Sequence, residues 1–273
     1  MVTFIPTPIG NLQDITFRAI EKLQEAELFL CEDTRVTKQL LKLIDEKVTP
    51  LEILETAKFL SFNEHNGKER LEEIGSLLES KSVVYLSDAG MPSISDPGME
   101  LVNYCIENSI EYDVLAGATA LATAYSASGF DGKFIFWGFL PHKTTKREQD
   151  LNRVLEFGLD TILYEAPHRL LKLLKEINQI DPKRELFLAK ELTKKHQKYY
   201  RDSAKILLQK FKDINIRGEW VVIIRAKEQN SLSISYSEIL QMEIPPKVKA
   251  KILSKITDLS TKEWYSRLVN SHY

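Results

Sequence analysis

Short apolar runs alternate with helical patterns through the first 115 residues of the chain. Residues 2–5, 27–31, 58–62, 83–86 and 112–115 have the length and composition of buried strands, and apolar residues at helical spacing follow each of the first four. Strands that are separated by helices run parallel and carry helices on both faces of the sheet. Residues 1–115 are therefore predicted to form an α/β domain, whose first helix we expect Asp14 to cap.

Residues 116–227 are predicted to form a second, smaller α/β domain with some antiparallel pairing. Its expected strands cover 134–139, 161–164, 186–189, 199–201 and 220–224, and its expected helices cover 146–157, 168–177 and 204–211. Residues 227–237 read as a polar linker. The tail to residue 273 contains two or three short helices, of which the last is capped by Ser260.

Polar side chains and loop residues follow several of the predicted strands. The Gly- and Pro-rich loop of residues 87–98 follows one strand, and a similar loop of residues 6–11 follows the first. The clusters at 32–35 and 63–66 follow two others. Because the carboxyl ends of parallel strands share one edge of a sheet, we expect these clusters to converge on a ligand site. The structural alternatives are that Asp33 caps a helix, that Asn63 makes a turn and that Pro167 starts a helix.

The charge of the chain is divided unevenly along its length. Residues 1–140 hold 11 Lys and Arg against 22 Asp and Glu, whereas residues 141–273 hold 26 against 17. A basic second half suits a polyanionic partner, although a solvated basic surface has the same composition. In residues 190–201 the cations alternate with aromatic side chains, which favours contacts to nucleic-acid phosphates and bases.

Several functional classes lack their motifs in this sequence. There is no Walker loop, no G-x-G-x-x-G after the first strand, no G-x-S-x-G elbow and no Cys/His spacing for zinc. Cys31 and Cys105 lie in apolar patterns and are expected to be buried structural thiols. No apolar run reaches membrane-spanning length and no leader pattern opens the chain, so we expect a cytoplasmic protein that is not bound to a membrane.

A series of motifs, in order along nearly the whole chain, resembles the ribosomal RNA small subunit methyltransferase I family of the tetrapyrrole methylase superfamily. The matching residues are 6–12, 14–16, 18–19, 32–35, 64–66, 87–90, 95–98, 126–129, 138–141, 164–165, 167–169, 191–194 and 218–219. The chain departs from the family pattern at Ala116 and Ala118, where two prolines are usual. Loss of these prolines removes a stiffening element from the loop before Thr119.

The resemblance implies an α/β fold of two tetrapyrrole-methylase-type domains with a short C-terminal helical segment. It also implies an enzyme, a homodimer, that methylates the 2′-hydroxyl of a cytidine in the decoding region of 16S ribosomal RNA, within the small ribosomal subunit and without a metal ion. S-adenosylmethionine is expected to bind in a cleft between the two domains. Its expected contacts are Pro8, Asp88, Ala89, Gly90, Ile94, Thr119, Ala120, Phe139 and Tyr164.

A ribose hydroxyl is a poor nucleophile while it keeps its proton, so a carboxylate or imidazole within hydrogen-bonding reach would help. Our hypothesis is that Glu32, Asp33 or His65 accepts or orients that proton, and that Arg35 holds a substrate phosphate or one of these carboxylates. Two alternatives remain at this point. A methylase of a corrin or porphyrin precursor would also use basic residues, and an RNA-binding protein without enzymatic activity would explain the basic half.

Overall fold

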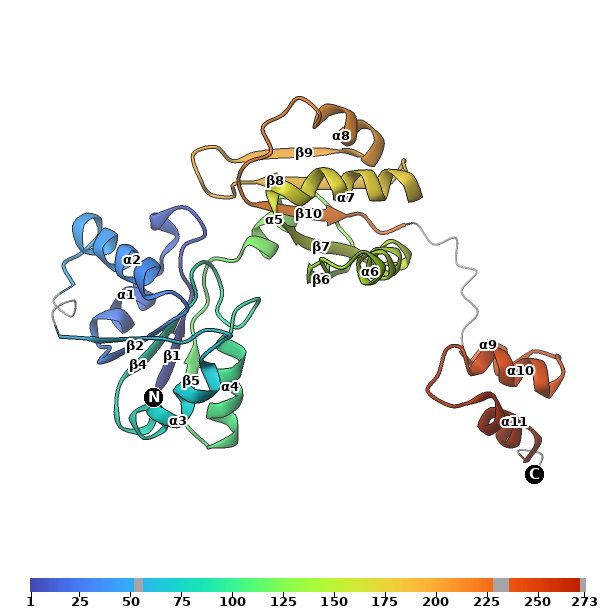
Figure 1. The fold of residues 1–273 in the computed structure, drawn as a ribbon, viewed down its shortest axis with the longest axis horizontal. Coiled ribbons are helices and arrows are strands. Elements are labelled where there is room, and N and C mark those ends of the chain that lie inside the picture. Colours follow the sequence, from blue (N-terminus) through green and yellow to red (C-terminus); the bar gives the residue numbers. More distant parts are fainter. Residues whose placement is uncertain (52–55, 228–235, 271–273) are drawn as a thin grey trace. The chain divides into compact units, whose positions relative to one another are not determined.

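The computed structural model describes residues 1–51, 56–227 and 236–270 (Figure 1). The chain divides into two compact units, Met1–Lys227 and residues 228–273, and each is described by itself. Within the described ranges, none of the helices is both long and apolar enough to cross a bilayer.

The first sheet of the larger unit is parallel throughout and has five strands in the order β3-β2-β4-β1-β5. Its strands are β1 (Val2–Ile5), β2 (Leu28–Cys31), β3 (Lys58–Ser61), β4 (Val83–Leu86) and β5 (Tyr112–Val114). The helices between them are η1 (Leu12–Asp14), α1 (Phe17–Gln24), α2 (Thr34–Lys47), α3 (Gly67–Ser80) and α4 (Gly98–Glu107). The predicted parallel α/β domain is confirmed.

Helices cover both faces of this sheet because successive strand residues point to opposite sides. Phe29, Val84 and their neighbours pack on one face against α1 and α2. Phe4 and Tyr85 pack on the other face against α3 and α4. The helices that follow β1 and β2 therefore lie on one face, and the helix that follows β4 lies on the opposite face.

The cap of the first helix differs from the sequence prediction. Asp14 ends the short 3-10 turn η1, and the extended Ile15 separates that turn from α1. Thr16 is the N-cap instead, since its Oγ1 accepts the amide hydrogen of Ala19 at 3.1 Å. The expectation for Asp14 was wrong because the apolar spacing does not reveal this break in the backbone.

The second sheet is mixed and has the order β6-β7-β10-β8-β9. Its strands are β6 (Phe134–Phe139), β7 (Asp160–Glu165), β8 (Glu185–Lys190), β9 (Lys198–Ser203) and β10 (Trp220–Ile224). Strands β6 and β7 are parallel, and the pairs β7–β10, β10–β8 and β8–β9 are antiparallel. The carboxyl ends of β6, β7 and β8 thus share one edge with the starting ends of β9 and β10.

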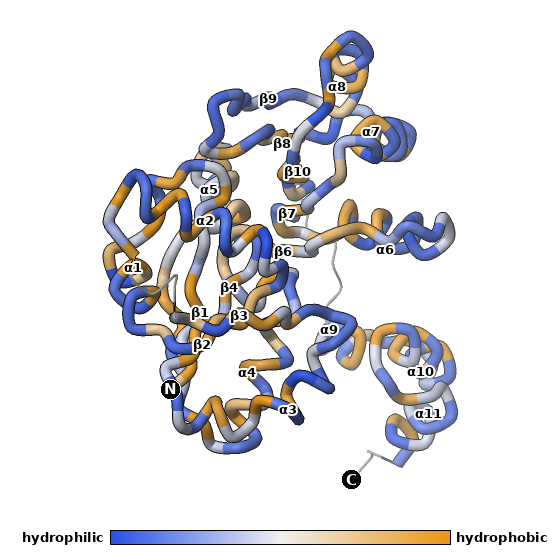
Figure 2. Tube along the Cα trace, turned by 60° about the vertical axis from the view of Figure 1, so that its left-hand side comes forward, coloured by the Kyte–Doolittle hydropathy of each residue, from blue (hydrophilic) through white to orange (hydrophobic). Residues whose placement is uncertain are grey.

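Helices also cover both faces of the second sheet. One face packs against α6 (Thr144–Glu156), α7 (Pro167–Ile180) and α8 (Ala204–Lys210). Figure 2 shows the mixture of apolar and polar residues along α6 and α7 that one buried and one solvated face require. The other face packs against α5 (Ala120–Ser128) and against Ile9 from the loop after β1, so one apolar cluster joins the two domains.

The smaller unit contains α9 (Tyr236–Gln241), α10 (Pro246–Leu253) and α11 (Thr261–Asn270). They enclose a small core of Ile239, Ala250, Leu253 and Trp264. Ser260 and Glu263 form a capping box, in which each side chain accepts the other's backbone amide. The predicted cap at Ser260 is confirmed. The predicted linker is shorter at its end, because α9 begins at Tyr236, and its residues 228–235 lie outside the described part.

Candidate functional site

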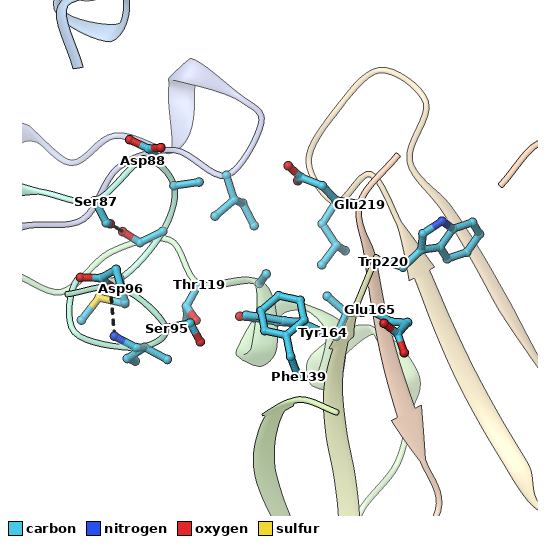
Figure 3. Close-up of a pocket in the computed structure, with 18 of the residues that line it drawn as sticks. Ser87, Asp88, Ser95, Asp96, Thr119, Phe139, Tyr164, Glu165, Glu219 and Trp220 are labelled. Atoms are coloured by element: carbon cyan, nitrogen blue, oxygen red, sulfur yellow. Dashed lines mark hydrogen bonds between the residues drawn. The ribbon is translucent and has the colours of Figure 1, made fainter. Parts of the chain in front are cut away.

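A cavity of about 470 Å³ lies at the carboxyl edge of the first sheet, between that edge and the second sheet. It opens beside the neighbouring strands β2, β4 and β1, whose helices depart to opposite faces of the sheet. This arrangement is the switch point at which open α/β sheets bind ligands. In Figure 3, Ser87, Asp88 and Asp96 lie on one side and Glu219 on the other, with Thr119 and the Phe139–Tyr164 pair between them, while the Trp220 indole points away from them.

Backbone contacts hold the loops of the first domain together at the cavity. The amide of Asp88 donates to Glu32 Oε2 at 2.9 Å, and the amide of Asp33 donates to Asp88 Oδ1 at 3.1 Å. Thr7 and Gly90 exchange two backbone hydrogen bonds of 3.0 Å. Gly90 has a φ of +86°, which only glycine adopts readily. The predicted convergence of the strand exits is therefore confirmed for residues 32–33 and 88.

Three carboxylates near this edge have different electrostatic surroundings. Burial, together with the negative charges of Asp88, Asp96 and Glu64, raises the pKa of Glu32 above its ordinary value. Burial also raises the pKa of Asp88. In contrast, hydrogen bonds from Arg35 lower the pKa of Asp33 to about 2. Glu32 and Asp88 thus bind a proton more readily than ordinary carboxylates of their kind, and Asp33 binds one less readily.

Asp96 is a structural member of this group. Its carboxylate accepts hydrogen bonds from the Tyr85 hydroxyl at 2.8 Å, from the Gly98 amide at 2.8 Å and from the Ile94 amide at 3.2 Å. These three bonds hold the loop between β4 and α4 in place along the cavity. The same loop carries Ser95 with a φ of +110°, an uncommon conformation for a residue other than glycine.

The second domain supplies an aromatic wall. Phe139 ends β6 and Tyr164 is the penultimate residue of β7, and their rings meet edge to face with centroids 5.7 Å apart. Burial raises the pKa of the Tyr164 hydroxyl, while hydrogen bonding with Thr119 and Leu121 opposes the rise. The wall is therefore a neutral, largely apolar surface that faces the carboxylates across the cavity.

The structure brings most of the expected cofactor residues to this cavity. Eight of the nine line it, namely Asp88, Ala89, Gly90, Ile94, Thr119, Ala120, Phe139 and Tyr164. Pro8 does not, although its neighbour Ile9 does. Their role in cofactor binding stays a prediction.

The four expected catalytic residues are placed differently. Glu32 lines the cavity, whereas Asp33, Arg35 and His65 do not. Asp33 is the N-cap of α2, so the structural alternative considered for it applies. His65 is exposed in a turn in which the Asn63 side chain accepts its backbone amide at 3.0 Å. Pro167 is likewise the first residue of α7, so the alternative that it starts a helix also applies.

Several lining residues were absent from the predicted site, chiefly Glu165, Leu192, Glu219 and Trp220. Glu219 precedes β10, and its backbone amide donates to Glu191 Oε1 at 2.8 Å. Lys194 pairs with Glu219 at 2.9 Å and closes this rim of the cavity. The motifs at 191–194 and 218–219 were the available signal, but their meeting depends on antiparallel pairing that periodicity does not reveal.

The last features to place are the two cysteines and any group of side chains that could bind a metal ion. Cys31 directly precedes Glu32, and burial raises the pKa of its thiol to about 12, so it is a neutral core residue. Cys105 is buried as well, which confirms both predictions of buried thiols. Across the described ranges, no three His, Cys, Asp or Glu side chains are grouped to hold a metal ion.

Comparison with known proteins places this architecture in a family. The model of the tetrapyrrole (corrin/porphyrin) methylases matches residues 1–207. Ribosomal RNA small subunit methyltransferase I of Helicobacter pylori is 43% identical over 277 residues, with 97% of this chain and 96% of the relative covered. The proteins of the same name from Campylobacter fetus and Thermotoga maritima are 42% and 44% identical and cover 98% and 82% of this chain, and 100% and 97% of their own lengths.

Solved structures agree on the fold. A uroporphyrin-III C-methyl transferase from Thermus thermophilus, complexed with S-adenyl homocysteine, has a TM-score of 0.55 at 15% identity and covers 81% of this chain and 96% of its own. A diphthine synthase has a TM-score of 0.58 at 13% identity and covers 82% and 89%. With these matches, the chain belongs to the tetrapyrrole methylases, and within them to the ribosomal RNA small subunit methyltransferase I family.

Proposed function

We propose that this protein uses S-adenosylmethionine to methylate small-subunit ribosomal RNA, at the 2′-hydroxyl of a cytidine in the decoding region. The near-full-length relatives are named as methyltransferases of small-subunit ribosomal RNA, and this supports the substrate class. The observation that carries the proposal is the cavity, because it combines a half-buried carboxylate of raised pKa with an apolar wall at the switch point of the sheet.

The residues present fit this cofactor. A volume of about 470 Å³ is in the range of small-molecule pockets. Phe139, Tyr164 and Ala120 offer an apolar surface to an adenosine, and the carboxylates of Glu32 and Asp88 offer negative charge to a sulfonium and an ammonium group. When bound, S-adenosylmethionine supplies an activated methyl group.

The chain's own contribution is to hold the ribose and take its proton. Of the three candidate bases, Glu32 is favoured because it lines the cavity and its pKa is raised toward neutrality. Its Oε2 accepts the Asp88 amide, so Oε1 is the oxygen that accepts the proton from the 2′-hydroxyl. Asp33, with a pKa of about 2, is too weak a base, and Arg35 holds its carboxylate as a fixed pair.

The second domain offers a basic rim for the RNA backbone. Because the ends of β6, β7 and β8 and the starts of β9 and β10 share one edge, exposed lysine, arginine and histidine side chains from five segments gather there. They are His142, Lys143, His168, Lys195, His196, Lys198 and Arg217. Phosphates would contact this rim while the ribose enters the acidic cavity, and such binding weakens as salt rises.

The context of the reaction is part of the same proposal. We expect a homodimer that acts on the RNA inside the small subunit, in the cytoplasm where subunits are assembled. Light scattering of the purified protein measures the oligomeric state, and a monomer at micromolar concentration would refute the homodimer.

The test is transfer of labelled methyl from S-adenosylmethionine to small ribosomal subunits that lack the modification, with naked 16S RNA in parallel. Nuclease mapping then shows whether the label lies on a ribose or a base. We expect label on a cytidine ribose in the decoding region. Cofactor binding without transfer to either substrate would refute the RNA proposal and make a tetrapyrrole the next substrate to test. RNA binding without cofactor binding would indicate a protein that is not an enzyme.

A further inference from the structure

A buried ionic network lies directly behind the aromatic wall of the cavity. Glu165, the last residue of β7, has a side chain that is 1% exposed and sits between two guanidinium groups. Arg147 Nη2 and Arg169 Nε lie 3.1 Å from its two oxygens. Arg147 also pairs with Glu176 at 2.9 Å, which balances the charges of the network.

The network is attached to both segments that form the wall. Arg169 Nη2 donates to the backbone carbonyls of Leu140 and Pro141, the two residues that follow Phe139. Its Nε pairs with Glu165, which follows Tyr164. One guanidinium therefore fixes the end of β6 relative to the end of β7, at the points where each strand delivers its aromatic ring.

Phe139 needs such support because its own packing is weak. The residue is 55% exposed, and its ring contact in the structure is the edge-to-face pair with Tyr164. Stability alone does not account for a buried ionic network, since apolar residues of similar volume often serve a core equally well or better. The rigid fork of an arginine, in contrast, can bond a carboxylate and carbonyl groups at fixed angles at the same time.

We propose that Arg169 and Glu165 are positioning residues, which hold the Phe139–Tyr164 wall in the geometry that binds the cofactor. The inference rests on the proposed function in one respect, that this cavity takes S-adenosylmethionine. Glu165 borders the cavity beside the wall, but neither guanidinium of the network lines it, so the effect of Arg169 on the ligand passes through the wall.

The chain offers a matched control in Arg184. This arginine is also buried, pairs with Asp181 at 3.1 Å and donates to two backbone carbonyls, those of Leu155 and Arg225. It precedes β8, at the edge of the second sheet opposite the cavity. Arg184 thus has the same kind of contacts as Arg169 without any connection to the wall.

The experiment compares Arg169→Lys with Arg184→Lys in the full chain. S-adenosylhomocysteine is titrated by calorimetry, and the free energy of unfolding is measured in urea. Lysine has a single nitrogen in place of the planar fork that reaches Glu165 from Nε and the two carbonyls from Nη2, so it cannot reproduce this geometry. Arg169→Lys is therefore expected to raise Kd about tenfold or more, with kcat at saturating cofactor little changed. Arg184→Lys is expected to leave Kd within about twofold of the unsubstituted protein at a similar loss of stability.

Arg169→Met and Arg184→Met extend the comparison, with the larger rise in Kd expected for Arg169→Met. If the methionine variants fail to fold, the lysine pair decides alone. Equal changes in Kd at both sites, or an unchanged Kd in Arg169→Lys, would overturn the inference. Failure of the unsubstituted protein to bind S-adenosylhomocysteine would instead refute the proposed function on which the inference rests.

Discussion

Glu32→Gln separates the chemical role of Glu32 from its structural role. The glutamine keeps the shape of the side chain, and its amide oxygen can still accept the Asp88 amide that bonds to Glu32 Oε2 at 2.9 Å. The variant loses the ability to take a proton. A positioned general base contributes about 10²- to 10⁴-fold, so kcat should fall by that factor, which corresponds to about 3 to 5 kcal/mol in the activation barrier.

The raised pKa of Glu32 determines how both activity and stability should change with pH. Activity requires the ionised form of Glu32, whose pKa is raised above its ordinary value of 4.5, so the acidic limb of kcat/KM should lie above that value and vanish in Glu32→Gln. Stability should change in the opposite sense. A raised folded-state pKa means that ionised Glu32 destabilises the native state at neutral pH, and this penalty is absent below 4.5. Glu32→Gln should therefore have the higher Tm at pH 7, with the difference lost as pH falls.

Single-turnover methylation of small subunits, followed from pH 5 to 9, measures the rate, and calorimetry measures cofactor affinity. Glu64→Gln is the control, because Glu64 adds negative charge to the same cluster but does not line the cavity. It should keep turnover within about twofold. A Glu32→Gln enzyme with normal turnover, or with an unchanged acidic limb, would show that the proton goes elsewhere.

Three further outcomes follow from the structure. A Cβ at Gly10 would lie 2.9 Å from the backbone oxygen of Leu192, so Gly10→Ala should push the loop that holds Gly10 away from the loop that holds Leu192. Cofactor binding, measured by calorimetry, should weaken about tenfold, and an unchanged Kd would contradict this expectation. Thr16→Ala removes the cap of α1 and should cost about 1 kcal/mol in urea unfolding, so an unaltered midpoint would count against it. Lys195→Ala on the basic rim should reduce the slope of log affinity for RNA against log salt by about 0.7, whereas Lys183→Ala, which precedes β8 at the opposite edge, should leave the slope unchanged.

The sequence located much of the site through one topological rule. Glu32 and Asp88 lie 56 positions apart in the chain, but both follow parallel strands, and the exits of such strands share an edge. His65 follows a parallel strand too. The order of the strands, which the sequence does not contain, puts β3 at the outside of the sheet, and the Asn63 turn leaves the His65 side chain in solvent.

The rest of the site depends on features without a local signature. Glu219 and Trp220 reach the cavity at the beginning of a strand, and only the antiparallel pairing of β10 brings that end to the shared edge. Arg169 lies within the motif at 167–169, but the hydrogen bond that it donates to the carbonyl of Leu140 depends on the positions of two strand ends in space. Periodicity predicts which face of an element is buried, and it carries no information on such contacts between elements.

The residues that line the cavity extend along the chain from Ile9 to Val221. During synthesis, the first domain leaves the ribosome long before β10 does, and domains fold as they emerge. The first sheet must therefore reach its native state without help from the cofactor, because half of the binding surface has not yet been made. Ligand binding stabilises only the completed unit, so a nascent chain that stalls before β10 would hold a folded first domain whose acidic edge stays open to solvent.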